Sequence, residues 1–159
     1  MKNDFNWEPV KEVTKLFATI FITMVPAISM LKAGLHGPLN KVITLLNNSE
    51  GESINLMYFW ITGILSAFLD NAPTYLVFFN TAGGDPHFLM NAGFETLIAI
   101  SAGSVFMGAL SYIGNAPNFM VKSIAEQNKI KMPSFFGYMI WSVVILIPIL
   151  IIFSLVYFK

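Results

Sequence analysis

Long runs without a charged residue constrain the fold of this chain more than any other feature of its sequence. Met132–Phe158 is a run of 27 uncharged residues and Thr96–Val121 a run of 26, while Ser53–Gly84 carries a single charge, on Asp70. A helix needs about 20 mostly apolar residues to cross the hydrocarbon core of a bilayer. We therefore expect an all-α integral membrane protein, multi-pass and located in the inner (cytoplasmic) membrane of the cell.

The rest of the composition excludes several classes of function. Nine acidic residues balance nine basic ones, so no net charge attracts nucleic acid. The chain has no cysteine, and so neither a disulfide framework nor a thiol nucleophile. The motifs of zinc proteases, serine hydrolases and P-loop ATPases are absent from the sequence, so we expect no enzyme and no organic cofactor.

The tripeptide Asn-Ala-Pro occurs twice, at Asn71-Ala72-Pro73 and at Asn115-Ala116-Pro117, each time inside a nearly uncharged stretch. Proline removes a backbone donor and interrupts a helix. Interrupted backbone at membrane depth survives only where protein or a water-filled cavity satisfies its peptide groups. Two such interruptions predict an ion or solute site near the middle of the bilayer.

These features divide one membrane domain, residues 1–159, into five expected segments. A re-entrant hairpin enters and leaves the membrane on one side, a broken helix crosses it, and an amphipathic helix lies at its surface. The segments are a spanning helix at 8–32, an interfacial helix at 36–48, the hairpin at 54–80, the broken helix at 92–127 and a spanning helix at 134–158.

The lysines distinguish a hairpin at 54–80 from a full crossing. A hairpin places six lysines on the side of the N-terminus and three on the other side, whereas a crossing gives four against five. Lysine is enriched in cytoplasmic loops. The count favours the hairpin, and with it a cytoplasmic N-terminus and an external C-terminus.

Asp70 is the single carboxylate within its membrane stretch. A charge at the middle of a membrane helix costs roughly 2.5–3.5 kcal/mol on insertion scales, and such residues are functional by default. We interpret Asp70 as a ligand for a sodium ion or a proton, beside backbone carbonyls freed by the break. It also suits the N-cap of the second hairpin arm, expected over 74–80, and the two roles are compatible.

Neutral oxygen donors surround both breaks. The side chains of Asn71, Thr74, Asn115 and Asn118 either complete a cation shell or cap the broken helices, and both interpretations stay open. The helix expected over 92–113 is rich in small residues, which predicts close packing of one of its faces against protein. We interpret four serines as packing residues of this kind: Ser66, Ser101, Ser104 and Ser111.

With these residues, the chain resembles the C-terminal half of carriers of the ion-transporter superfamily. The nearest branch holds bacterial sodium/proton antiporters and arsenite- or citrate-type permeases. The resemblance covers nearly the whole chain. It is carried by Trp7-Glu8-Pro9-Val10, Glu12-Val13, Leu16-Phe17, Leu69-Asp70-Asn71-Ala72-Pro73-Thr74 and Gly114-Asn115-Ala116-Pro117-Asn118.

The resemblance implies two inverted halves whose hairpin and broken-helix tips face each other across the substrate site and move as an elevator. The dicarboxylate carriers favour Ser-Asn-Thr at these tips, so Asp70 indicates a branch that handles cations or protons. The expected partners are the lipid bilayer, a missing N-terminal half or second half-carrier chain, and a second copy in a homodimer. The implied binding residues are Asp70 (also the sodium ligand), Asn71, Pro73 and Thr74 at the hairpin tip, and Asn115, Ala116, Pro117 and Asn118 at the broken-helix loop.

Three functions follow from this interpretation. The first is a portion of a sodium/proton antiporter in which Asp70 binds one ion and then the other. The second is a sodium- or proton-coupled permease for a small anion of the citrate or arsenite type. The third is a membrane subunit that packs against partners without transporting anything.

Overall fold

A computed structural model describes residues 7–33, 36–38 and 40–158. The secondary structure of these residues is helical, apart from one isolated antiparallel bridge between Asn47 and Ser53. The helices are α1 (Glu8–Lys32), α2 (Asn40–Leu46), α3 (Asn55–Leu69), α4 (Asn71–Thr81), α5 (Pro86–Leu89), α6 (Phe94–Met107), the 3-10 turn η2 (Gly108–Leu110), α7 (Ala116–Gln127) and α8 (Phe135–Tyr157).

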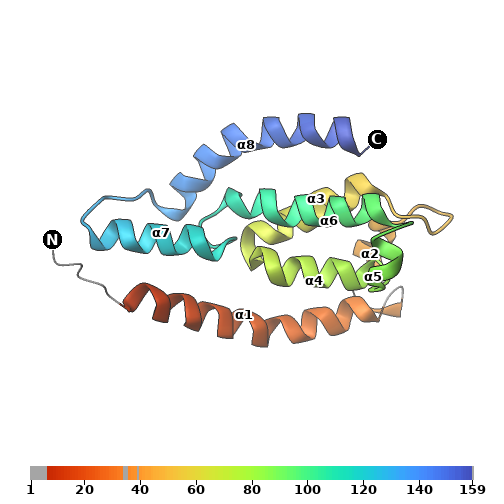
Figure 1. Cartoon of the computed structure of the whole chain (residues 1–159), viewed down its shortest axis with the longest axis horizontal. Coiled ribbons are helices and arrows are strands. Elements are labelled where there is room, and N and C mark those ends of the chain that lie inside the picture. Colours follow the sequence, from red (N-terminus) through yellow and green to blue (C-terminus); the bar gives the residue numbers. More distant parts are fainter. Residues whose placement is uncertain (1–6, 34–35, 39, 159) are drawn as a thin grey trace.

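The helices form an elongated bundle with two interruptions near its middle (Figure 1). Helix α3 runs from one end of the bundle to the middle, and α4 returns to the same end. Helix α6 runs beside α3 in the same direction, and α7 continues beyond the break to the opposite end. Helices α1 and α8 flank this group on opposite sides, so that the hairpin and the broken helix lie between them (Figure 1).

Helices α3 and α4 are both short in comparison with a membrane-spanning helix. Helix α3 has 15 residues and α4 has 11, which correspond to about 22 and 16 Å at 1.5 Å per residue. Both are shorter than the hydrocarbon core of about 30 Å. In the described part of the chain, α8 is the one helix that is both long and apolar enough to cross a membrane, whereas the apolar stretch of α1 covers only Val13–Thr23.

Glycine lets α3 and α6 approach closely. A Cβ atom on Gly103 would overlap the carbonyl oxygen of Phe59, and one on Gly63 would overlap the side chain of Met107. Ala99 and Ser104 on the same helix are buried. The small residues of α6 therefore meet protein, as the sequence predicts.

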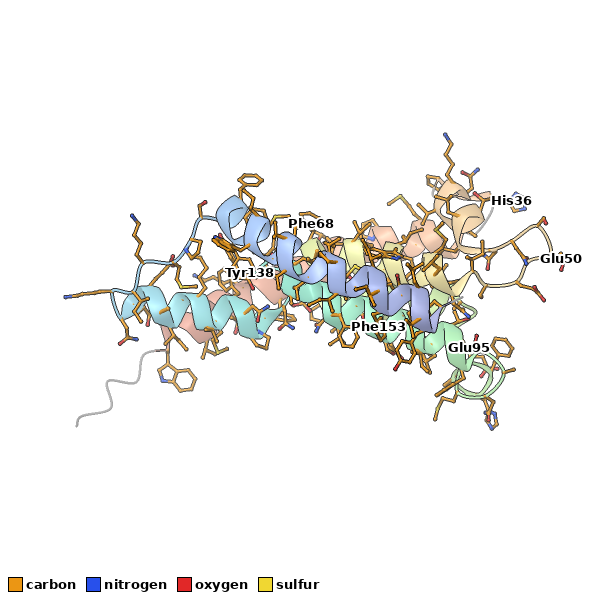
Figure 2. The ribbon with its side chains drawn as sticks, turned by 90° about the horizontal axis from the view of Figure 1, so that it is seen from above. His36, Glu50, Phe68, Glu95, Tyr138 and Phe153 are labelled. Atoms are coloured by element: carbon orange, nitrogen blue, oxygen red, sulfur yellow. The ribbon has the colours of Figure 1, made fainter. Side chains whose placement is uncertain are left out.

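Polar contacts fix the parallel register of α3 and α6 at their first turns. The Thr96 hydroxyl donates to Asn55 Oδ1 at 2.7 Å, and Asn55 Nδ2 donates to Glu95 Oε2 at 3.2 Å. Figure 2 shows Glu95, Glu50 and His36 at this end of the bundle, where the hairpin opens. The two helices thus start together and end at a similar depth.

Helix α8 presents apolar side chains on most of its surface. Phe136, Trp141 and Ile152 are all exposed. A soluble monomer rarely leaves so large an apolar surface in water. Such a surface fits contact with lipid or with further membrane protein.

Several boundaries differ from those expected. The helix expected over 92–113 ends as a regular helix at Met107 and as a 3-10 turn at Leu110, since Ser111 has extended backbone angles. The interfacial helix expected at 36–48 is shorter, covering Asn40–Leu46. The second hairpin arm begins at Asn71 and not at Thr74, because Asp70 alone makes the reversal.

Candidate functional site

The hairpin turn consists of one residue, Asp70. Its φ of 81° and ψ of 150° fall in a region that non-glycine residues rarely adopt, at a cost of order 1–3 kcal/mol. The turn is closed locally, because Asp70 Oδ1 accepts the N–H of Ala72 at 3.2 Å. The Thr74 hydroxyl donates to the carbonyl oxygen of Asp70 at 2.6 Å. Backbone strain held in place by such contacts is common at functional sites.

The second break, residues 111–115, is organised by the hydroxyl of Ser111. This hydroxyl donates to the carbonyl oxygen of Ala67 at the end of α3. It also accepts the N–H groups of Ile113 at 3.2 Å and Gly114 at 3.0 Å. The interpretation of Ser111 as a packing residue is therefore incomplete, since its side chain joins the two breaks.

Helix α8 satisfies further carbonyls at the end of η2. The Ser142 hydroxyl donates to Leu110 O at 2.6 Å, and the Tyr138 hydroxyl donates to Ala109 O at 3.4 Å. Tyr138 is half-buried and faces the broken helix. Figure 2 shows Tyr138 near the start of α8, in the half of the bundle that contains α7.

The two breaks are in direct contact. A Cβ atom on Gly114 would lie 2.7 Å from Ser66 O and 2.8 Å from Ala67 O, both on α3. The backbone N–H of Ala116, in the first turn of α7, faces the Asp70 carboxylate, as do those of Asn71 and Ala72. The carboxylate thus lies between the N-terminal ends of α4 and α7, where the helix dipoles favour negative charge.

Two side-chain oxygens at this contact are buried without a hydrogen-bond partner among the described residues, Asp70 Oδ2 and Asn115 Oδ1. Asp70 is 1% exposed, and neither ion pair of the described chain involves it. A buried charge with an unpaired oxygen is costly unless a cation or a proton neutralises it. Carboxylate and amide oxygens are suitable ligands for a hard cation.

A third unpaired oxygen lies deeper along α3. Thr62 Oγ1 is fully buried and has no hydrogen-bond partner among the described residues. Thr62 and Ser66 are spaced four apart, so they share one face of α3. Ser66 on this face donates to the carbonyl oxygen of Ser104 on α6.

A groove of about 410 Å³ opens beside the hairpin turn, between α4 and α6. Amide and hydroxyl groups line it together with apolar side chains, and no charged residue does so. Its lining residues are Asn71, Ala72, Tyr75, Ser101, Ser104 and Val105.

The residues expected at the hairpin tip lie together at the turn. Asn71 is half-buried beside the groove, Pro73 is buried in the first turn of α4, and the Thr74 hydroxyl is already bonded to Asp70. This hydrogen bond gives Thr74 a structural role at the turn.

The residues expected at the broken-helix loop are less uniform. The N–H of Ala116 faces the Asp70 carboxylate, as described above, and Asn115 is half-buried, whereas Pro117 is exposed. The N–H of Asn118 donates to Asn115 O at 3.1 Å, so it belongs to the first turn of α7. No described hydrogen bond joins the Asn118 side chain to the hairpin. Of the eight binding residues expected from the sequence, Pro117 and the Asn118 side chain therefore have no described contact with the hairpin turn.

Comparison with known proteins adds one finding. A family model described as "Putative citrate transport" matches residues 1–158, nearly the whole chain. No curated protein and no solved structure gives a significant match.

Proposed function

Because the chain belongs to this putative citrate transport family, we propose that it forms part of a cation-coupled carrier for citrate or a similar small carboxylate. Family membership assigns the chain to membrane transport and not to catalysis. Of the functions expected from the sequence, the anion permease has better support than sodium/proton antiport, since the family description names an anion.

One observation carries the proposal: the buried Asp70 carboxylate has an unpaired oxygen where the two breaks meet, and Asn115, in the second break, has another. A sodium ion would gain both oxygens as ligands, and a proton would neutralise the carboxylate. The two cations compete for one group and are not held together.

Charge balance explains why such a site would couple a cation to an anion. Two like unit charges about 6 Å apart repel by about 3 kcal/mol at an effective dielectric constant of 20. A carboxylate substrate in the neighbouring groove would meet this repulsion from an ionised Asp70. A bound sodium ion or proton removes the repulsion, so the anion binds well only after the cation.

The groove offers neutral donors for the substrate. Asn71 supplies an amide N–H₂ and Ser101 a hydroxyl, and both residues line the groove. The groove also lies beside the first turn of α4, which adds the positive end of a helix dipole. Neutral donors bind a carboxylate less tightly than a positively charged side chain would, so the substrate can also be released.

The proposal includes the membrane arrangement. The N-terminus would be cytoplasmic, because Lys11, Lys15, Lys122, Lys129 and Lys131 belong to segments at that end of the bundle, against Lys32 and Lys41 at the other end. A second half of the carrier, in another polypeptide or another part of the same one, would complete the site in the manner of inverted-repeat carriers. Lipid surrounds this assembly, and two copies of it would form a dimer.

Substitution of Asp70 tests the function. In membrane vesicles that contain the assembled carrier, we expect Asp70→Asn to lower citrate uptake driven by a sodium or proton gradient roughly 100-fold, equivalent to about 2.7 kcal/mol. The matched control is Asp85→Asn, since Asp85 is also an aspartate N-cap, accepting the N–H of His87 at 2.9 Å, but lies in an exposed loop. Undiminished gradient-driven uptake in Asp70→Asn would refute the coupling role.

The same experiment separates the non-transporting alternative. If Asp70→Asn left citrate uptake intact and instead prevented a partner chain from co-purifying, Asp70 would be an assembly contact. Sodium/proton exchange without citrate uptake by the wild-type carrier would restore antiport as the better interpretation.

A further inference from the structure

Helix α7 carries a lysine whose ammonium group lies against the broken-helix loop. Lys122 Nζ is 5.0 Å from the centre of the Tyr112 ring, and Tyr112 belongs to the loop that contacts the hairpin. The Lys122 side chain is only 18% exposed. The ammonium group thus lies against an aromatic ring of the protein.

The charge of Lys122 is held by a partner that can be displaced. Its ammonium group donates to Glu126 Oε2 at 2.8 Å, one turn further along α7, and the Glu126 side chain is 47% exposed. An open hollow of about 280 Å³ along one face of α7 adjoins this pair and is lined by Phe119, Lys122, Ser123, Glu126 and Gln127. A carboxylate that enters this hollow meets the ammonium group that Glu126 already binds.

A second lysine–glutamate pair shows what is unusual here. Lys11 and Glu8 form an ion pair of 3.0 Å on α1, with side chains that are 61% and 55% exposed, as is ordinary for a solvated surface. Lys122 is far more enclosed and adds contact with an aromatic face, which strengthens when water is excluded. An enclosed cation of this kind beside an open hollow is suited to bind an anion.

We propose that Lys122 is an anion-binding residue on the side of the membrane that contains the N-terminus. It binds a carboxylate group of the substrate before that substrate reaches the central groove, and Glu126 competes with the substrate for the ammonium group. This role rests on the proposed function. It adds a subsite that the two helix breaks do not provide, and the class of ligand is a small carboxylate with more than one acidic group.

The test uses opposite predictions for the two members of one ion pair. With labelled citrate offered from the side of the N-terminus, in vesicles of defined orientation, Lys122→Gln should raise KM about 10-fold, whereas Glu126→Gln should lower it about threefold. Both substitutions break the same ion pair. A purely structural pair would therefore shift KM in the same direction in both variants, and that result would overturn the inference.

Three controls sharpen this test. Lys122→Arg keeps the charge and should retain a KM close to that of the wild type, and Lys11→Gln removes the exposed pair on α1 without an effect. The double variant Lys122→Glu/Glu126→Lys keeps an ion pair but moves the cation to position 126. Its KM should therefore stay above that of the wild type. Full recovery in the double variant, or equal effects from both faces of the membrane, would contradict the proposal.

A binding measurement keeps the inference separate from the proposed function. Citrate should protect Lys122 against an amine-reactive reagent applied from the side of the N-terminus, as followed by mass spectrometry of the intact carrier. Protection without any citrate transport would support the subsite while refuting the proposed function. Transport without protection would refute the subsite alone.

Discussion

The two breaks contain the same tripeptide but place it in different registers. In the hairpin, Asp70 is the N-cap and Asn71 is the first residue of α4. In the broken helix, Asn115 itself is the N-cap and Ala116 is the first residue of α7. A shift of one residue thus places the asparagine of the tripeptide either at the first position of the following helix or at its N-cap.

The shift accompanies opposite chain directions. At Asp70 the chain reverses, and the turn is closed by side chains within four residues of it. At residues 111–115 the chain continues, and Ser111, Tyr138 and Ser142 supply hydrogen bonds between distant segments. The comparison teaches that a reversal can be encoded locally, whereas a break in a continuing helix needs tertiary partners.

The contact between the two breaks should be the most sensitive point. We expect Gly114→Ala to destabilise the protein by about 3 kcal/mol, because its Cβ would crowd three backbone oxygens, those of Ser66, Ala67 and Gly108, that cannot rotate away. Reversible unfolding in mixed micelles measures the change. Gly137→Ala is the control, since its new Cβ would lie 3.2 Å from the Ser134 hydroxyl, and equal losses in both variants would argue against the close contact.

The dependence of the second break on Ser111 should rank next. Ser111→Ala leaves one carbonyl and two N–H groups without their partner, and we expect a loss of about 2 kcal/mol. In the control, Ser29→Ala removes a hydroxyl that donates to Val25 O on an exposed face of α1. Similar unfolding free energies for the two variants would show that the second break does not depend on this hydroxyl.

Strain at the hairpin turn should contribute less, about 1.3 kcal/mol once the capping difference is subtracted. Asp70→Gly should be more stable than Asp70→Ala by about 2 kcal/mol, because glycine tolerates a φ of 81° and also caps helices better than alanine. The same two substitutions at Asp85, an N-cap with a φ of −90°, isolate the capping difference of roughly 0.7 kcal/mol. Equal differences at the two positions would indicate an unstrained turn.

Substitution of Asn115, the N-cap of α7, should give the smallest change in the free energy of unfolding. Asn115→Ala should cost less than about 0.5 kcal/mol, since Asn115 makes no side-chain capping bond and its Oδ1 is unpaired. Citrate uptake should nevertheless fall if this oxygen binds the coupling cation. A loss near the ordinary capping value of about 1 kcal/mol, with uptake unchanged, would favour a purely structural asparagine.

Much of the architecture could be predicted from local features. The two Asn-Ala-Pro tripeptides locate both interruptions, because proline and the preceding asparagine act on the backbone next to them. The charge-free runs indicate the apolar helices. Asp70 is identifiable as exceptional because any carboxylate in such a stretch needs compensation.

The remaining features depend on contacts that no local pattern records. Ser111, Tyr138 and Ser142 look like ordinary packing or surface residues until α3, η2 and α8 are placed side by side. The register shift between the tripeptides is equally hidden, since it follows from the direction that the chain takes after each break. The enclosed position of the Lys122 ammonium group depends on its contact with Tyr112, which lies ten residues earlier in the broken-helix loop.

The packing of α3 against α6 also bears on how the protein is made. Synthesis proceeds from the N-terminus, so the ribosome completes the hairpin before the helix whose Ser104 carbonyl receives Ser66. Until α6 is made, it cannot pack against α3 to shield the Asp70 carboxylate from lipid. We expect nascent chains that stop before residue 94 to keep the turn in water, and chains extended past residue 127 to withdraw it. A cysteine introduced as Ala72→Cys in this cysteine-free chain would report the difference through thiol labelling.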